Sequence, residues 1–199
     1  MHAVGQSVAC RKHSNSGKEV GMKTTVLVFH PNLETSRVNK ELTQAVLNDP
    51  NHDVTVRDEY ATYPDGRIDV AAEQRLVEDS DRIVLQFPFY WYSSPSLLKL
   101  WEDKVLEYGW AYGSTGHAFE GKEIMLAVSA GSGEADYQHD GSHHATMEEL
   151  LKPFATMADY VGARYLPPFV VYGVGAGIDD DTLAATARRY AQVINEPAK

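Results

Sequence analysis

The stretch TTVLVFHPNLETSRVN (residues 24–39) decides the fold class of this chain. Its first six residues are apolar or β-branched without alternation, which is typical of a strand buried on both faces of a parallel sheet. A polar loop follows, and a helical pattern begins at about Ser36, with Val38 and Leu42 on one face. A buried strand that leads directly into an amphipathic helix favours an α/β domain.

The alternation of strand and helix continues to the end of the chain. Further strands are expected at residues 53–57, 82–87, 123–128 and 169–172. Further helices are expected after an Asp69 N-cap, after Ser94-Pro95, over residues 147–161 and from Asp180 or Asp181. Five strands and five helices predict a doubly wound parallel sheet with helices on both faces. The alternation leaves the strand order open, and we expect the flavodoxin-like order 2-1-3-4-5. In that order, the loops after the first, third and fourth strands converge on one crevice.

Single residues predict how one of these helices is interrupted and how it ends. Pro153 lies inside the pattern of residues 147–161, and a proline there kinks or breaks a helix. Gly162 stands where a C-cap glycine belongs.

Composition limits the class of protein. The chain has 199 residues, 43% hydrophobic and 23% charged, which fits one globular domain. A net charge of −10 disfavours nucleic acid as a partner, because phosphate backbones demand a basic face. The single cysteine, Cys10, rules out an intramolecular disulfide and a cysteine-based zinc site, and it fits a cytoplasmic location. No run approaches ~18 apolar residues, so no membrane span is expected.

The first 21 residues differ in composition from the rest of the chain. They are polar and lack the apolar run of a secretory signal. We expect residues 1–21 to be a disordered N-terminal extension and residues 22–199 to form the folded domain.

The loop after the first strand is suited to a phosphate. A helix start leaves unpaired N–H groups and a partial positive charge. Ser36 and Asn39 add side-chain donors, and His30 adds an imidazole N–H. Ordinary helix capping by Thr35 or Ser36 is the alternative interpretation.

The loops after the third and fourth strands are suited to a planar ring. Residues 87–92 contain five aromatic side chains, and consecutive side chains cannot all face the core. Some of this aromatic surface is therefore expected to meet a ligand or a partner chain, with a purely structural role as the alternative. Residues 130–133 are rich in glycine, which lets backbone N–H groups approach a ligand closely.

The segment 136–144 carries side chains that can transfer protons. Tyr137 and His143 can donate protons to a substrate or stabilise charge on it. A metal site is the alternative, and its ligands would be Asp136, His139, Asp140, His143 and His144. We expect no metal.

Two glycine motifs do not support nucleotide binding. Residues 116–122 have Walker A spacing, but they precede a strand and Glu123 replaces the metal-binding Ser or Thr. Residues 173–177 lack the third glycine of a dinucleotide fingerprint and follow the last strand.

Together these motifs resemble the flavodoxin-like NAD(P)H:quinone oxidoreductases, the family of DT-diaphorase and the bacterial modulators of drug activity. The resemblance covers about residues 24–195. Its most specific parts are His30-Pro31 with residues 36–39, and PFYWYSSPSLLKLW at residues 88–101; WAYG (110–113) and LPPF (166–169) extend it. The chain is most similar to the short bacterial branch, which includes the ancillary flavoprotein of glutathione-gated potassium efflux systems.

The resemblance implies FMN as the cofactor and Tyr137 and His143 as the catalytic pair beside it. The cofactor-binding residues that it implies are His30, Ser36, Arg37, Val38, Asn39, Pro88, Phe89, Tyr90, Trp91, Tyr92, Ala130, Gly131, Ser132 and Gly133. Two departures from the family leave FAD as an alternative cofactor: residues 129–132 read Ser-Ala-Gly-Ser instead of Thr-Thr-Gly-Gly, and Tyr90 stands where glutamine is common.

We therefore expect a cytoplasmic NAD(P)H:quinone oxidoreductase that transfers hydride by a ping-pong mechanism, in a homodimer with the site at its interface. The alternative is a regulatory ancillary subunit of a glutathione-gated potassium efflux protein, peripheral at the inner face of the membrane. An electron carrier of the flavodoxin type is a third interpretation.

Overall fold

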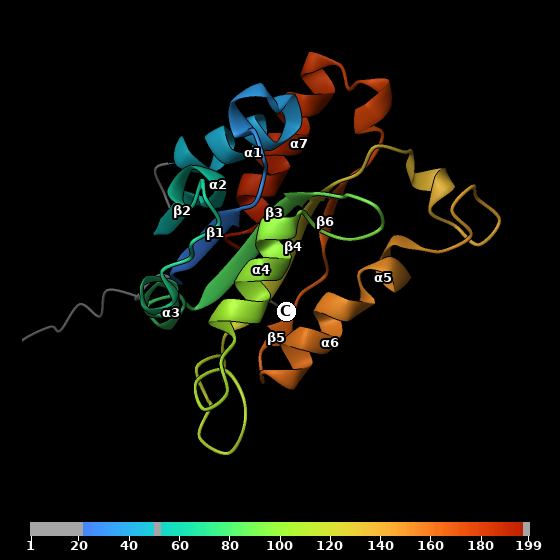
Figure 1. Cartoon of the computed structure of the whole chain (residues 1–199). Helices are drawn as coiled ribbons and strands as arrows, with labels where there is room; N and C mark the ends of the chain where they lie inside the picture. Colours follow the sequence, from blue (N-terminus) through green and yellow to red (C-terminus); the bar gives the residue numbers. More distant parts are fainter. Residues whose placement is uncertain (1–21, 50–52, 197–199) are drawn as a thin grey trace, which may run out of the picture.

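A single parallel sheet forms the centre of the protein (Figure 1). The computed structural model describes residues 22–49 and 53–196, so the expected extension of residues 1–21 lies outside the described residues. The strands are β1 (Thr24–Val28), β2 (Val54–Asp58), β3 (Arg82–Pro88), β4 (Glu123–Ser129), β5 (Arg164–Tyr165) and β6 (Phe169–Val171). The order is β2-β1-β3-β4-β5, with β6 also paired to β4, which confirms the predicted order 2-1-3-4-5.

The edge strand is split into two pieces, which the sequence did not predict. β5 pairs with the beginning of β4 (Ile124 opposite Tyr165), and β6 pairs with its end (Ala127 opposite Phe169). Pro167 and Pro168 lie between the two pieces. Proline has no N–H to donate, so the hydrogen-bond ladder is interrupted there.

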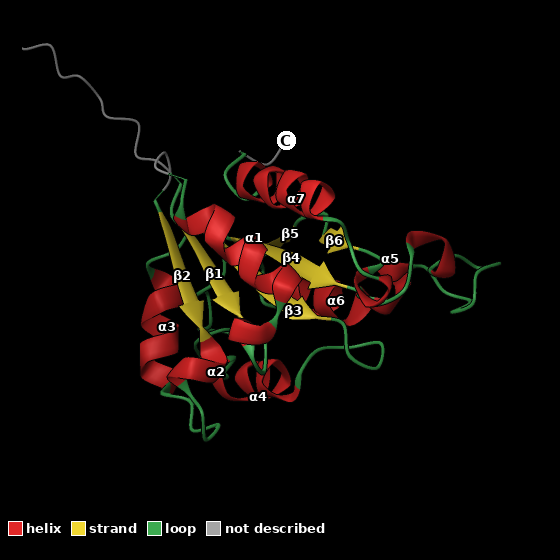
Figure 2. Ribbon diagram, turned by 90° about the horizontal axis from the view of Figure 1, so that it is seen from above, coloured by secondary structure: helices red, strands yellow, loops and turns green. Residues whose placement is uncertain are grey.

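Helices cover both faces of the sheet (Figure 2). α1 (Arg37–Leu47) and α7 (Asp180–Val193) lie on one face. α3 (Val70–Glu78), α4 (Ser96–Val105), α5 (Met147–Leu150) and α6 (Lys152–Tyr160) lie on the other. A further short helix, α2 (Glu59–Thr62), follows β2, and 3-10 turns occur at η1 (Leu33–Thr35), η2 (Glu134–Asp136) and η3 (Val174–Ala176).

Two hydrophobic cores result, one on each face. Successive residues of a strand point to opposite faces. Val26 and Val28 of β1 therefore join the core under α1 and α7, whereas Leu27 and Phe29 join the core with Trp101 of α4.

The helix ends follow the predictions with one shift. Asp69 caps α3 by accepting the N–H of Ala72. α4 begins at Ser96 with Pro95 as the N-cap, one residue later than predicted. The Tyr60 hydroxyl accepts the N–H of Leu97 at 3.4 Å, a bond that replaces capping by the Ser94 side chain.

The long helical pattern of residues 147–161 is divided, as Pro153 predicted. α5 and α6 meet at Leu151, where the helical ladder is interrupted two residues before the proline. Gly162 follows the C-cap of α6 with a φ of +80°, a conformation that suits glycine. Within the described residues, no helix is long and apolar enough to cross a bilayer.

Candidate active site

Direct contacts join the loops after β1, β3 and β4. The side-chain amide nitrogen of Asn39, in the first turn of α1, lies 2.9 Å from the hydroxyl of Ser129 at the end of β4. The N–H of Phe89, just after β3, donates to the carbonyl of the same Ser129 at 2.9 Å. The ring of Phe89 also contacts that of Tyr137, with centroids 6.1 Å apart. The three loops therefore form one site at the carboxyl ends of the strands.

The loop after β1 presents a helix start. Ser36 is the N-cap of α1 and accepts the N–H of Asn39 at 3.3 Å, so the capping interpretation holds for this hydroxyl. His30 Nδ1 accepts the N–H of Asn32 at 3.1 Å, and burial lowers the pKa of the imidazole. The imidazole is therefore held in the loop in its neutral form, where its other nitrogen is a donor.

Arg37 and Val38 offer this loop only their main chain. The Arg37 guanidinium bonds to the carbonyl of Ile178 and, at 2.5 Å, to the carboxylate of Asp180. The Val38 side chain is buried in the core under α1. The first N–H groups of the helix remain available to an anion, because an α-helix has no internal acceptor for them.

The amide of Asn39 is the strongest indication of a ligand in this part of the site. Asn39 is only 2% exposed, and its Nδ2 lies 3.2 Å from Ser36 Oγ and 2.9 Å from Ser129 Oγ. Its Oδ1 is buried and has no partner among the described residues. A buried polar atom without a partner is costly, so a hydroxyl-rich group bound here would satisfy it.

The aromatic loop after β3 is a tight hairpin. Tyr90 and Ser93 exchange main-chain hydrogen bonds of 3.0 and 2.9 Å, with Trp91 (φ +48°) and Tyr92 (φ +61°) at the corner. Positive φ at both corner residues defines a type I′ turn, which normally uses Asn-Gly. Pro88 is buried at the end of β3, whereas Tyr90, Trp91 and Tyr92 are 43%, 93% and 50% exposed. A purely structural role does not account for three exposed rings.

The glycine-rich loop after β4 has fewer free donors than its sequence suggests. The N–H of Ala130 donates to Val171, and that of Gly133 donates to the Asp136 carboxylate at 3.0 Å. Gly131 and Ser132 lie between them, and a side chain added to Gly131 would meet nothing within 4 Å. The Ser132 N–H faces the Tyr137 hydroxyl, so Gly131 is the amide of this loop that can face a ligand.

The second glycine motif, residues 173–177, hydrogen-bonds to the main chain of this loop. Val174 and Gly175 donate their N–H groups to the carbonyls of Ala130 and Gly131, at 3.0 and 2.9 Å. A Cβ on Gly175 would lie 3.0 Å from the Gly131 oxygen, tighter than ordinary contact. Gly175 thus serves close packing, whereas Gly173 and Gly177 adopt positive φ angles of +74° and +87°.

The rings of Tyr137 and His143 pack against each other. Their ring centroids are 4.4 Å apart with an interplanar angle of 34°. Burial raises the pKa of Tyr137, and hydrogen bonding to Ser132 opposes this only in part. The phenol is therefore a neutral donor at neutral pH. The Nε2 of His143 is buried without a partner among the described residues.

Asp136 fixes the shape of this segment, a role that the sequence did not reveal. Its carboxylate accepts from Gly133 N–H at 3.0 Å and from the Ser142 hydroxyl at 2.7 Å, and its carbonyl accepts from His143 N–H at 3.0 Å. Gly141 packs so closely that a Cβ there would lie 2.3 Å from the carbonyl oxygen of Ala135. Acidic and imidazole side chains in the segment prompted the metal alternative, yet no three such side chains cluster as ligands in the described part of the chain.

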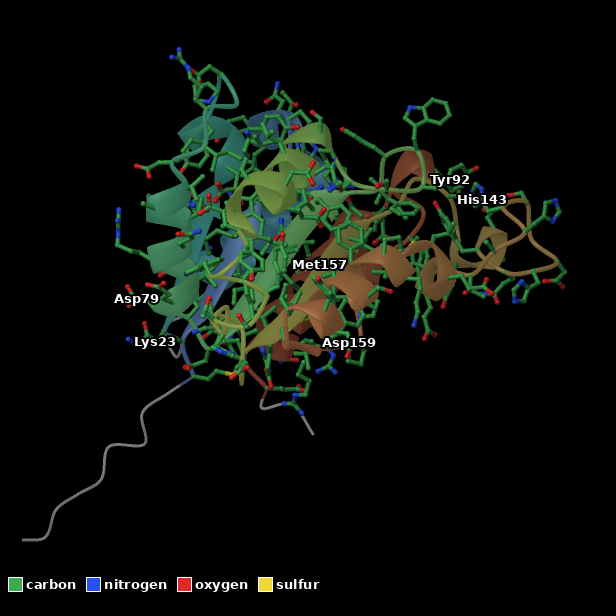
Figure 3. The ribbon with its side chains drawn as sticks, turned by 60° about the horizontal axis from the view of Figure 1, so that its bottom comes forward. Lys23, Asp79, Tyr92, His143, Met157 and Asp159 are labelled. Carbon is green, nitrogen blue, oxygen red and sulfur yellow. The ribbon has the colours of Figure 1, made fainter. Side chains whose placement is uncertain are left out.

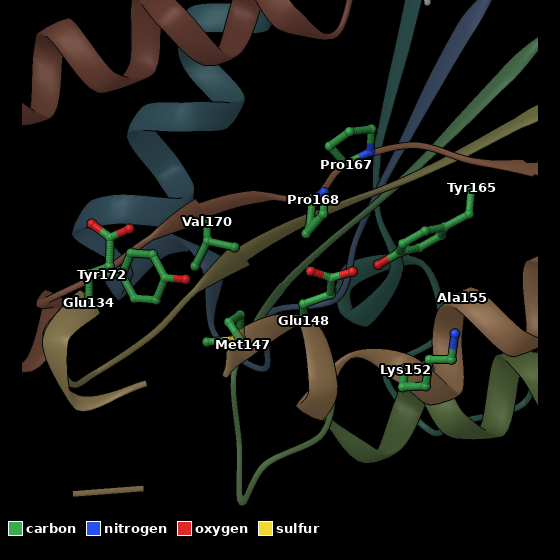
Figure 4. A pocket seen from close by; sticks show the side chains of 10 residues that line it. All are labelled: Glu134, Met147, Glu148, Lys152, Ala155, Tyr165, Pro167, Pro168, Val170 and Tyr172. Atoms are coloured by element: carbon green, nitrogen blue, oxygen red, sulfur yellow. The ribbon is translucent and has the colours of Figure 1, made fainter. Parts of the chain in front are cut away.

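A cavity of about 710 Å³ lies beside this site, between α5 and α6 on one side and the split edge strand on the other (Figure 4). Its lining includes Lys152, Tyr165 and Tyr172 but none of the residues predicted from the sequence. Tyr172 is the shared wall, because its ring lies 5.6 Å from that of Tyr137. The cavity therefore lies behind Tyr137, and neither Tyr137 nor His143 lines it.

Comparison with known proteins agrees with this geometry. A family model described as the flavodoxin-like fold matches residues 22–194. The chain belongs to the flavodoxin-like fold family. Two curated relatives of this flavodoxin-like chain are an uncharacterized NAD(P)H oxidoreductase, YrkL, of Bacillus subtilis (strain 168) and the glutathione-regulated potassium-efflux system ancillary protein KefF of Enterobacter sp. (strain 638). YrkL is 53% identical over 76% of this chain and 86% of its own length. KefF is 44% identical over 84% of this chain and 92% of its own length.

Two solved structures extend the comparison. General stress protein 14 from Treponema denticola, solved in complex with FMN, is 45% identical and superposes with a TM-score of 0.81 over 86% of this chain and 97% of its own. An NADPH-quinone reductase from P. pentosaceus is 31% identical, with a TM-score of 0.78 over 89% of this chain and 100% of its own. The resemblance read from the sequence is confirmed at the level of the family and its fold.

Proposed function

We propose that this flavodoxin-like protein is an NAD(P)H:quinone oxidoreductase that uses FMN. The observation that carries the proposal is that three loops with complementary donors meet at one place, where Asn39 Oδ1 and His143 Nε2 are both buried without partners. An FMN-containing relative at 45% identity and a quinone reductase at 31% identity support the choice of cofactor and acceptor.

The residues of the first loop fit the polar end of FMN. The opening N–H groups of α1, with the Ser36 hydroxyl and the His30 imidazole, suit the phosphate. Asn39 Oδ1 is an acceptor suited to a ribityl hydroxyl.

The other two loops fit the ring. The hairpin of Phe89 to Ser93 gives aromatic faces, and the N–H group of Gly131 suits the polar edge of a planar ring. When bound, FMN accepts a hydride from the reduced nicotinamide and passes it to the acceptor. One open slot above the ring would serve both substrates in turn, which is the physical basis of ping-pong kinetics.

Tyr137 and His143 would handle the charge and the proton on the acceptor. A quinone oxygen gains negative charge when its ring receives a hydride, and neutral donors fixed beside it stabilise that charge. The Tyr137 hydroxyl remains protonated at neutral pH because burial raises its pKa. Buried donors exclude competing water and act in a low dielectric, where hydrogen bonds are stronger.

We also propose a cytoplasmic homodimer with the site at its interface. Trp91 is 93% exposed, and a second aromatic cluster contains Tyr108 and Tyr160, exposed at 71% and 70%, with Tyr112 between them. Rings exposed to this degree in a single chain mark interaction surfaces. Mutual burial of the two clusters about a twofold axis would close the slot above the ring.

A regulatory role beside a potassium-efflux protein is the second candidate. The similarity to KefF at 44% identity favours it, and it is compatible with quinone reduction by the same chain. Co-purification of the tagged chain with such a transporter, from membranes of the source cell, would support it. A dimer that remains entirely in the soluble fraction, with high quinone turnover, would contradict it.

The experiment for the main proposal is steady-state kinetics with NADPH and a soluble benzoquinone on FMN-loaded protein. Parallel double-reciprocal lines are expected from one shared slot. Converging lines would show that both substrates bind together and would contradict the shared slot.

A further inference from the structure

Tyr92 contacts the catalytic pair in a way that the resemblance did not suggest. Its hydroxyl lies 3.3 Å from Nδ1 of His143, and the two rings pack edge to face with centroids 5.5 Å apart (Figure 3). Within the described residues this is the hydrogen-bond contact of the His143 ring, since Nε2 has none. The resemblance instead implies that Tyr92 is a ring contact of the cofactor, where only its aromatic face would matter.

The backbone of Tyr92 has a conformation that tyrosine disfavours. Tyr92 and Trp91 both have positive φ, a conformation that residues other than glycine disfavour. Asn-Gly would form the same turn without that cost. Strain of this kind persists where the surroundings determine the conformation, and it clusters at functional sites.

His143, the second residue of this contact, is held by the segment after β4. Asp136 binds the main chain of His143 and the hydroxyl of Ser142, and close packing of Gly141 leaves no freedom for the turn. Tyr137 covers one face of the imidazole at 4.4 Å. The Tyr92–His143 contact is thus formed by two rigid segments and is not a chance meeting of mobile side chains.

This contact couples the tautomer of His143 to the direction of one hydrogen bond, in which the Tyr92 hydroxyl either donates to Nδ1 or accepts from it. A phenol is a good donor, and an unprotonated imidazole nitrogen is a good acceptor. If the Tyr92 hydroxyl donates to Nδ1, the proton of a neutral imidazole must reside on Nε2. Nε2 is the buried atom without a partner, so its N–H is left free to serve a bound molecule.

We propose that Tyr92 is a positioning residue that fixes the Nε2–H tautomer of His143, so that His143 presents a donor to the acceptor oxygen. This inference rests on the proposed quinone reduction for its purpose, but the tautomer itself is a property of the chain alone. Around the imidazole, the titratable groups are Tyr92 from the hairpin after β3 and Asp136 and Tyr137 from the segment after β4, with Tyr172 of the β6 end behind Tyr137.

The first test is independent of cofactor and activity. Long-range ¹H–¹⁵N spectra of protein labelled in histidine distinguish the two tautomers, and the His143→Gln variant identifies the signals of His143. In the wild-type protein at pH 8, Nδ1 is expected at the unprotonated shift and Nε2 at the protonated shift. In Tyr92→Phe, which keeps the ring and loses the hydroxyl, both shifts should move toward an averaged value. A wild-type Nδ1–H tautomer, or unchanged shifts in the variant, would overturn the proposal.

The second test concerns the reaction. Tyr92→Phe should slow re-oxidation of the reduced cofactor by a benzoquinone about fivefold, the equivalent of one net hydrogen bond. Cofactor reduction by NADPH should stay within twofold, because that half-reaction delivers no proton to the acceptor. Tyr165→Phe is the matched control, since it removes the hydroxyl of a tyrosine outside the site that has no partner in the described structure. Equal rates in wild type and Tyr92→Phe would refute a role for Tyr92, whereas an inactive wild type with the expected tautomer would refute the proposed function alone.

Discussion

The side-chain amide nitrogen of Asn39 lies 2.9 Å from the hydroxyl of Ser129, and this contact ties the first turn of α1 to the end of β4. Gln86 of β3 joins the same group, because its amide donates to the Asn39 carbonyl at 3.0 Å and to the Thr43 hydroxyl at 3.1 Å. The part of the site suited to phosphate and the part suited to the ring therefore share one buried polar network.

Replacing Asn39 should damage both folding and cofactor binding. Asn39→Ala removes one hydrogen-bond partner from Ser36 and one from Ser129. A buried hydrogen-bonding group left unsatisfied costs about 1–3 kcal/mol. We expect the free energy of unfolding to fall by that amount in urea titrations, and FMN to bind at least tenfold more weakly by fluorescence titration. Asn48→Ala, at the exposed C-cap of α1, is the control and should change neither. Wild-type FMN affinity in Asn39→Ala would contradict the assignment of Asn39 to the site.

The catalytic pair should affect turnover and spare cofactor binding. Tyr137→Phe and His143→Gln each remove a donor beside the acceptor, and such donors contribute about 100- to 1,000-fold to rate. Stopped-flow re-oxidation by a benzoquinone should show this loss, with FMN affinity unchanged. His139→Gln alters a neighbouring exposed histidine and should react like the wild type. If all three variants re-oxidise at the wild-type rate, the acceptor binds elsewhere.

The strained hairpin predicts a conflict between stability and function. Trp91 has a φ of +48° and a nearly fully exposed side chain, so the ring contributes little to folding of the single chain. Asparagine tolerates this conformation better than tryptophan. Trp91→Asn should therefore stabilise the cofactor-free monomer by about 1 kcal/mol and weaken dimer formation in sedimentation equilibrium. A variant that is less stable as a monomer would show that Trp91 packs against its own chain.

A buried charge network at the carboxyl end of β2 predicts an unusual dependence of stability on pH. Glu59 and Glu73 are fully buried and share the Arg57 guanidinium. Burial raises the pKa of Glu59 to about 7, against 4.5 for an ordinary glutamate. Between these two values the folded protein holds a proton that the unfolded chain releases, so this group makes the free energy of unfolding fall as pH rises from about 4.5 to 7.

Glu59→Gln tests this directly. The amide cannot ionise, so the decline between about pH 4.5 and 7 should flatten, and the variant should be more stable than wild type at pH 8. Urea titrations at half-unit intervals measure the slope. A variant whose slope matches the wild type would show that another group causes the decline.

Local patterns in the sequence were sufficient for most of the sheet and its helices. The unbroken apolar run before His30 marks β1, and Asp69 and Gly162 mark helix ends by their own chemistry. The divided edge strand was missed although Pro167-Pro168 was visible, because strand pieces of two or three residues give no periodicity. α2 was missed for a similar reason, since it has only four residues.

The sequence pointed to the loops of the site but not to its internal bonding. Which amides of the glycine loop are free depends on Val171 and Asp136, and neither contact has a local signal. Arg37 was grouped with the phosphate site as a residue of the helix start, and no motif indicated that its side chain pairs with Asp180, a residue 143 positions away. Contacts of this range are set by the packing of whole elements, and a single sequence does not encode them in any short motif.

The central claim is that the convergence of three loops forms an FMN site that reduces quinones. The most direct measurement is the visible absorbance spectrum of purified protein saturated with FMN, mixed without oxygen first with NADPH and then with a soluble benzoquinone. The account predicts flavin bands that bleach on addition of NADPH and return on addition of the quinone. A protein that binds neither FMN nor FAD, or whose bound FMN stays oxidised with NADPH, would contradict it.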